Sequence, residues 1–378
     1  MNDRALLLIG ESYNNADMYH AIRFLFSDPV IYLRHQEGDL LVCSNFERAE
    51  AAQHSRVREV LAFDQFEYPR LLRELPKRYQ AFAELVRRVV ARYGVMALTV
   101  TGQAPVHVVD HLRAHGVDVI CDPEAVLGER LVKQDDALAA LQTVQRANER
   151  AMWTAIEMIA DSVPRHGVLV LGDEPLTAER LHAAIDASFL AMGCLAEGTI
   201  TAGGPAGASP HNTGAGPFAP NQTIVLDIFP RHKQLRYYAD MTRTVSKGDP
   251  GPELCHMYDT VLRAQEVALS MIAPGVNGRT VYAAVCRHFE DAGYATSLRT
   301  GSYPERGFIH SLGHGLGLEI HEAPHLGDRD EILDVGHVVT VEPGLYDPRI
   351  GGVRIEDVVV VTPHGCSNLT QFEKRLVV

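Results

Sequence analysis

Short apolar runs alternate with helical patterns over the first part of the chain. The runs predict strands at residues 5–10, 30–33, 40–43, 97–100 and 117–121. The clearest helical pattern covers residues 76–93, where apolar side chains recur every three or four positions and Gly94 can end the helix. This alternation predicts a small α/β domain at residues 1–130.

A second domain is predicted at residues 131–378, where helices flank a group of strands. Its predicted helices cover residues 133–163, which Pro164 ends, a segment between Pro175 and Gly193, and residues 252–272 and 279–292. Residues 198–220 are rich in glycine and proline. Such a stretch is either an active-site loop or a plain connection, and its place before the next strand favours the loop.

Acidic side chains stand in apolar strand patterns of this second domain. Asp227 and Asp240 lie on the two strands of a hairpin predicted at residues 222–245, so their side chains can converge on one face. Glu342 ends an apolar strand, and Glu356 lies in an alternating run. A carboxylate in an apolar strand is costly unless it is paired or binds a metal. The alternative for each acid is a surface position.

Histidines and glycines are concentrated in residues 308–325. Three glycines at 313, 315 and 317 would cost a helix about 3 kcal/mol relative to alanine, so we predict an irregular strand that approaches another chain segment closely. A solvated glycine-rich loop remains the alternative. A second histidine series, His107, His111 and His115, has a spacing that can clamp a metal on a helix. No acidic or cysteine partner is evident in the sequence, so we predict that this series is a helix surface.

The amino-acid composition and net charge argue against several classes of protein. The chain has 378 residues, of which 46% are hydrophobic and 22% charged, as in ordinary soluble proteins. A formal charge of −13 argues against binding to nucleic acid or to anionic membranes. The six cysteines include no CxxC pair, which favours reduced thiols in a cytoplasm. The apolar run at residues 5–10 is too short for a signal peptide, and no later run reaches the ~20 residues of a membrane span.

The four carboxylates and His314 form a set with a definite chemistry. Four converging carboxylates repel one another and need cations, and an oxygen-rich set with one imidazole suits paired divalent ions such as Mn²⁺, Co²⁺ or Zn²⁺. Two such ions can share a water molecule, lower its pKa and polarise a carbonyl group. The pattern therefore predicts a hydrolase.

The motifs that carry these residues resemble those of the pita-bread metallopeptidases, which include methionine aminopeptidase, aminopeptidase P, prolidase and creatinase. The matching phrases are VLD at Asp227, DMTRT at Asp240, GHGLGLEIHE at His314, VEPG at Glu342 and VRIED at Glu356. The resemblance implies a creatinase-like N-terminal α/β domain and a pseudo-symmetric catalytic domain of antiparallel strands with helices on one face. The two aspartates are thirteen residues apart, whereas the family usually has eleven. An insertion of two residues preserves side-chain parity in a hairpin.

Site roles follow from the resemblance. The two metal ions would be held by Asp227, Asp240, His314, Glu342 and Glu356. Asp240 and Glu356 would bridge the two ions, and Glu342 would also relay the proton of the nucleophilic water.

The resemblance also implies roles for three histidines and an arginine. His211 would contact the scissile region of the substrate, and His321 would stabilise the tetrahedral oxyanion. His310 would face the pocket for proline. Arg354 would hold the carboxylates in place.

The length of the chain and the presence of all five metal-ligand residues favour some activities of this family over others. Two domains favour an Xaa-Pro dipeptidase or aminopeptidase over methionine aminopeptidase, and five metal ligands disfavour creatinase. The expected substrate is a proline-containing dipeptide or short peptide, and the expected ion is Mn²⁺, with Co²⁺ or Zn²⁺ as alternatives. The resemblance also implies a homodimer. A lyase acting on sulfonium compounds and a non-catalytic binding relative remain as alternative functions.

Overall fold

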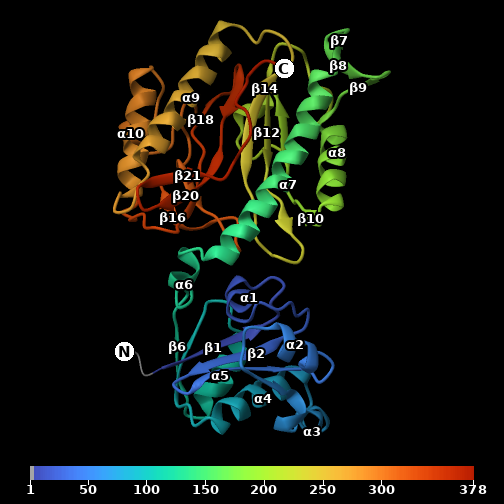
Figure 1. Ribbon diagram of the computed structural model, residues 1–378, viewed down its shortest axis with the longest axis vertical. Helices are drawn as coiled ribbons and strands as arrows, with labels where there is room; N and C mark the ends of the chain where they lie inside the picture. The colour runs from blue at the N-terminus through green and yellow to red at the C-terminus, as the bar shows by residue number, and fades with distance from the viewer. Residues whose placement is uncertain (1–3) are drawn as a thin grey trace. The chain divides into compact units, whose positions relative to one another are not determined.

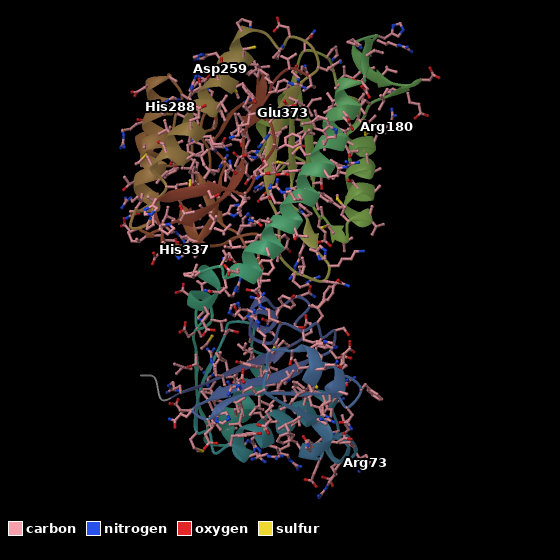
Figure 2. All side chains as sticks on the ribbon, in the orientation of Figure 1. Arg73, Arg180, Asp259, His288, His337 and Glu373 are labelled. Atoms are coloured by element: carbon pink, nitrogen blue, oxygen red, sulfur yellow. The ribbon has the colours of Figure 1, made fainter. Side chains whose placement is uncertain are left out.

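The computed structural model describes residues 4–378, and the chain folds into two compact units, Met1–Arg130 and Leu131–Val378. Each unit has its own sheets and helices (Figure 1). Side chains such as Arg73 on α3 and Asp259 on α9 are exposed on the surfaces of their units (Figure 2). No helix of the described residues is long and apolar enough to cross a membrane.

The first unit contains a six-stranded sheet with the strand order β4-β3-β2-β1-β5-β6. Its strands are β1 (Ala5–Gly10), β2 (Val30–His35), β3 (Gly38–Cys43), β4 (Glu59–Ala62), β5 (Ala97–Val100) and β6 (Asp118–Cys121). Strands β1, β2 and β3 are joined by antiparallel pairing, and β4, β5 and β6 are added by parallel pairing. All five predicted strands are confirmed, whereas β4 was missed.

Helices cover both faces of this sheet. They are α1 (Ala16–Ile22), α2 (Arg48–His54), α3 (Tyr68–Glu74), α4 (Arg78–Arg92) and α5 (Val106–Ala114), with a 3-10 turn at Phe63–Phe66. The short helix α6 (Leu127–Leu131) follows β6 in the chain. Leu7 and Ile9 pack with α4 and α5, whereas Leu6 and Leu8 pack with α1 and α2. Alternate residues of β1 therefore face opposite helical layers, which explains why its sequence is apolar throughout rather than alternating.

The second unit is built mainly from two antiparallel sheets. One has the order β11-β12-β14 and the other β16-β15-β17-β20-β21. Their strands are β11 (Ile200–Gly203), β12 (Thr223–Ile228), β14 (Met241–Ser246), β15 (Gly313–Gly315), β16 (Glu322–Leu326), β17 (Val338–Val341), β20 (Asp357–Thr362) and β21 (Gly365–Asn368). Smaller ribbons pair β18 (Gly344–Asp347) with β19 (Gly351–Arg354), β10 (Cys194–Leu195) with β13 (Arg231–His232), and β7 (Val163–Arg165), β8 (Val168–Leu171) and β9 (Glu174–Pro175) together.

Two pairs of helices accompany these sheets (Figure 1). The paired helices are α7 (Asp135–Ala160), α8 (Ala178–Ala191), α9 (Pro252–Met271) and α10 (Gly278–Asp291), and the short α11 (Ser297–Thr300) follows them. Helices α7 and α8 contact the sheet that contains β12, and α9 and α10 contact the sheet that contains β17. The four long helices agree with the predicted ones to within a few residues at each end.

Three predicted segments differ from the observed ones. The glycine-rich segment 198–220 is more than a loop, because β11 pairs with β12 and the 3-10 turn Gly204–Ala208 follows it. Pro164 does not end the long helix, which stops at Ala160. The predicted strand through Glu356 is two strands, because the Glu356 amide leaves the ladder and donates to Thr242 O at 3.1 Å.

Candidate metal centre

The two aspartates come from neighbouring strands of one sheet. In the β12–β14 register, Asp227 lies opposite Thr242, so Asp240 is the diagonal neighbour two residues earlier and projects to the same face. Asp240 is the residue directly before β14 rather than within it. Burial and then the negative charge of Asp227 raise the pKa of Asp240 well above its ordinary range.

His314 projects from the middle of β15 toward these acids. Its Nδ1 lies 3.1 Å from Gly315 O, and since a carbonyl oxygen only accepts, Nδ1 carries the proton. Its Nε2, which is then a lone-pair donor, lies 3.7 Å from Asp240 Oδ2 and 3.3 Å from Glu342 Oε1. Glycine is required beside it, because a Cβ on Gly313 would overlap the backbone carbonyl of Thr340. The close approach predicted from the glycine spacing is therefore confirmed.

The two glutamates lie at strand ends and are oriented by threonines. Glu342 follows β17, and Thr340 Oγ1 donates to its Oε1 at 3.2 Å. Glu356 precedes β20, and Thr242 Oγ1 donates to its Oε2 at 2.8 Å. Each hydroxyl group thereby fixes one oxygen of its carboxylate, and the second oxygen of each carboxylate accepts no bond from that threonine.

The electrostatics of this group call for cations. Burial and the neighbouring acids raise the pKa values of Asp240 and Glu356 well above the ordinary range, and burial raises that of Glu342 to about 8. Asp227 Oδ1 and Glu356 Oε1 are buried and accept no hydrogen bond. Single ligand atoms of Asp240, His314 and Glu356 lie within 4.8 Å of one another. Repulsion and unsatisfied oxygens are both relieved by bound divalent ions, so the donor set fits such ions.

Arg354 is the cation that the chain itself supplies. Its side chain is 4% exposed and donates to Asp227 Oδ2 at 2.5 Å, to Thr242 Oγ1 at 3.1 Å and to Tyr346 Oη at 2.7 Å. The Tyr346 hydroxyl in turn lies 2.9 Å from His310 Nε2. Sequence analysis missed Tyr346, because a tyrosine in an apolar strand carries no signal of a polar role.

Two further histidines, His310 and His321, belong to this group of residues and differ in how far they are buried. His310 Nδ1 lies 2.6 Å from Ser311 O, so Nδ1 carries a proton and Nε2 accepts from Tyr346. Burial and then the charge of Arg354 lower the pKa of His310 to about 3, which keeps the ring neutral. His321 is exposed, and its ring stands edge-on to His314 with 4.4 Å between centroids.

His211 is exposed in the segment after the 3-10 turn Gly204–Ala208. Its charge contributes to lowering the pKa values of both His310 and His321, with burial as the larger cause in each case. Direct contacts, in part through Thr242 and Tyr346, therefore link eight of the nine residues singled out from the sequence, and His211 is linked to them only through its effect on the pKa values of His310 and His321.

Comparison with known proteins identifies the family. The model of metallopeptidase family M24 matches residues 139–363, which is more than half of the chain. The chain belongs to metallopeptidase family M24. An Xaa-Pro dipeptidase of Pyrococcus furiosus is 31% identical over 249 residues, an alignment that spans 65% of this chain and 65% of that protein.

Two solved structures of similar fold span nearly the whole chain. The X-Pro aminopeptidase of Thermotoga maritima has 25% identity and a TM-score of 0.81, with 100% of this chain and 98% of that chain covered. The Xaa-Pro dipeptidase of Bacillus anthracis also has 25% identity and a TM-score of 0.81, with 99% and 95% covered. The predicted mixed α/β fold, an N-terminal domain followed by a pita-bread domain, is confirmed.

Proposed function

We propose that this M24 protein hydrolyses the Xaa-Pro bond at the N-terminus of dipeptides or short peptides with the help of two divalent metal ions. The observation that carries the proposal is the buried group of four carboxylates and His314, with two carboxylate oxygens that accept no hydrogen bond. Similarity to both an Xaa-Pro dipeptidase and an X-Pro aminopeptidase supports the substrate class.

The proposed ligands of the two ions are Asp227, Asp240, His314, Glu342 and Glu356. Asp240 and Glu356 are the proposed bridging ligands. When bound, the ions would polarise the scissile carbonyl and lower the pKa of the attacking water. Mn²⁺ suits an oxygen-rich set best, with Co²⁺ and Zn²⁺ as alternatives.

Glu342 and the three histidines have separate roles in the proposed reaction. Glu342 accepts a proton as the nucleophile is generated, because its carboxylate lies at the centre, with Oε1 3.3 Å from His314 Nε2, and a positioned carboxylate can act as a general base. His321 and His211 are exposed, so they can reach the peptide, with His321 donating to the developing oxyanion and His211 contacting the scissile region. His310 is neutral and bonded at both nitrogens, so it shapes the proline side of the site rather than transferring protons.

Arg354 has a positioning role. It binds Asp227 and offsets part of the charge of the acids while the ions are absent or exchanging. Its contact with Tyr346 couples the ligands to His310.

The deciding experiment is hydrolysis of an Xaa-Pro dipeptide and an Xaa-Pro-Yaa tripeptide by metal-stripped protein, with Mn²⁺, Co²⁺ or Zn²⁺ added back. Cleavage should require metal and should be lost in Asp240→Ala. It should persist in Asp259→Ala, which changes an exposed aspartate on α9 (Figure 2). The preferred peptide then separates dipeptidase from aminopeptidase. Metal binding without cleavage of either peptide would refute the proposed substrate class. The alternative function, a lyase acting on sulfonium compounds, would then be tested.

Assembly and compartment are also part of the proposal. We expect a homodimer, which sedimentation analysis can test. Six cysteines without a disulfide pairing among the described residues support a reducing cytoplasm.

A further inference from the structure

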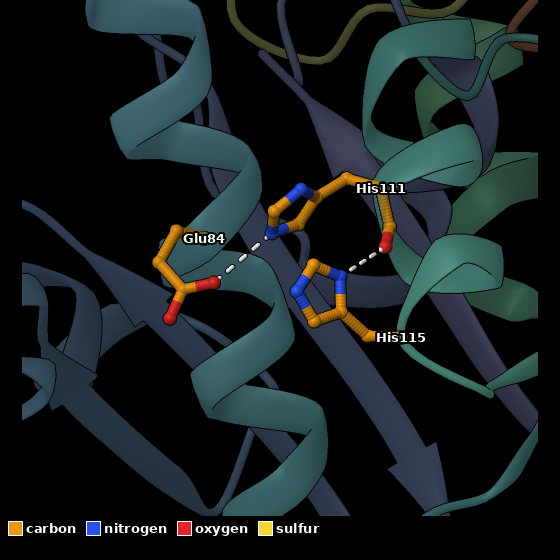
Figure 3. Close-up of side chains that lie close together, drawn as sticks. All are labelled: Glu84, His111 and His115. Atoms are coloured by element: carbon orange, nitrogen blue, oxygen red, sulfur yellow. Dashed lines mark hydrogen bonds and ion pairs between the residues drawn. The ribbon is translucent and has the colours of Figure 1, made fainter.

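A second group of metal-ligating side chains lies in the N-terminal unit, between helices α4 and α5. Glu84 projects from α4, His111 from α5, and His115 directly follows the end of α5 (Figure 3). His111 Nε2 lies 3.0 Å from Glu84 Oε2, and one ligand atom from each of the three residues lies within 4.8 Å of the others. The sequence supplied the two histidines, and the fold supplies the acid that the sequence did not reveal.

We propose that Glu84, His111 and His115 form a transition-metal site, best suited to Zn²⁺, with a fourth position open to water. One carboxylate and two imidazoles are ligands that zinc accepts in sites that keep a solvent position. The backbone carbonyl of His111 lies 2.8 Å from His115 Nδ1. That contact fixes the proton on Nδ1 and presents His115 Nε2 as a lone-pair donor, the arrangement typical of zinc-bound histidines.

Small movements of exposed groups complete the site. Zinc bonds of about 2.0–2.2 Å require the ligand atoms to lie closer together than 4.8 Å. His115 is exposed, so its ring can turn inward without repacking the core. His111 is half-buried, and its Nε2 must transfer the proton that it now directs at Glu84 to Nδ1 or to solvent.

The two arginines that contact Glu84 have two opposing effects on metal binding. Arg87 binds both oxygens of Glu84 at 2.7 Å, and Arg88 Nε lies 3.2 Å from Oε1. These contacts, with Arg87 as the largest cause, lower the pKa of Glu84 to about 2 and hold the carboxylate ionised and oriented toward α5. Their positive charges also repel a cation, so the site binds zinc more weakly than a dedicated structural site does.

Bound zinc would connect two helices that cover the same face of the sheet. Helices α4 and α5 pack on one hydrophobic cluster, and the three ligands join the middle of α4 to the end of α5. A ligand that binds only the folded state stabilises that state, so zinc would raise the melting temperature of the N-terminal unit.

The test is zinc stoichiometry of the metal-stripped full-length protein by equilibrium dialysis. Because the catalytic centre also takes up metal, the comparison is between variants. Wild type and His107→Ala should bind one more equivalent of Zn²⁺ than His115→Ala does. His107 is a matched control, since it lies on the same helix but its ring packs on Tyr79, with 5.5 Å between centroids.

Equal stoichiometry and equal affinities in wild type and His115→Ala would overturn the proposal. Anomalous scattering at the zinc edge gives a second readout. Density between α4 and α5 would support the site, and density confined to the carboxylates around His314 would refute it. Neither result depends on peptidase activity, so the fate of this site and that of the proposed function are separable.

Discussion

A buried ion pair next to His321 in the sequence gives the sharpest test of which interactions stabilise the second unit. Lys133 Nζ contacts Glu322 Oε1, and their side chains are only 3% and 1% exposed. Removing one partner of such a pair leaves the other charge buried, which costs about 3–5 kcal/mol. We therefore expect Lys133→Met and Glu322→Gln each to lower the free energy of unfolding by about that amount.

The double variant is the informative one. Lys133→Met combined with Glu322→Gln contains no buried charge at this position, so its destabilisation should fall short of the sum of the two single changes. Residues in direct contact typically show such non-additivity at about 0.5–3 kcal/mol. In a unit of this size, a loss of 3–5 kcal/mol corresponds to a fall in melting temperature of about 6–20 °C.

The chain offers a built-in probe for this measurement. Its one tryptophan, Trp153, lies on α7 in the same unit as the pair and packs against Phe372. Urea-induced unfolding followed by tryptophan fluorescence therefore reports on the second unit alone. Single changes below about 1 kcal/mol, or effects that add fully in the double variant, would refute the view that the pair is a coupled buried charge pair.

Further predictions concern the metal centre and the strand that carries its histidine. Tyr346→Phe removes the hydroxyl between Arg354 and His310, and the loss of about 1 kcal/mol of hydrogen bonding should lower kcat/KM about fivefold and the melting temperature by about 2–4 °C; an unchanged kcat/KM would contradict the positioning role. Gly313→Ala should destabilise the second unit by about 1–3 kcal/mol or more, because the new methyl group overlaps Thr340 O; an unchanged thermal unfolding curve would contradict this close approach. Chelation should abolish Xaa-Pro hydrolysis, and Mn²⁺ should restore it; activity that survives exhaustive chelation would contradict metal dependence.

The sequence revealed those parts of the molecule whose chemistry conflicts with their surroundings. Asp227 in an apolar strand is costly unless it has a partner, and the conflict is visible in the letters alone. The three glycines around His314 are unfavourable in a regular helix, and this conflict likewise predicted that the backbone approaches another segment closely. Where a residue agrees with its surroundings, no such signal exists, and Tyr346 in β18 and the strand β11 were both missed.

Long-range pairing set a second limit on prediction. Glu84 precedes His111 by 27 positions, and only the packing of α4 on α5 brings them together. Lys133 and Glu322 are separated by 189 positions. A periodic pattern defines a helix and its buried face, but it does not say which neighbouring helix meets that face. Contacts of this kind depend on the assembled fold.

The geometry of the histidines also limits how the proposed reaction can proceed. His310 and His314 each have Nδ1 fixed by a backbone carbonyl, and burial lowers the pKa of each to about 3, so neither takes up a proton near neutral pH. His211 and His321 are exposed and are not held in this way by any described contact. In the proposed reaction, proton transfer to a departing amine therefore falls to the exposed pair or to Glu342. In the proposed mechanism, the buried histidines orient the site, and the exposed ones act on a substrate that arrives from solvent.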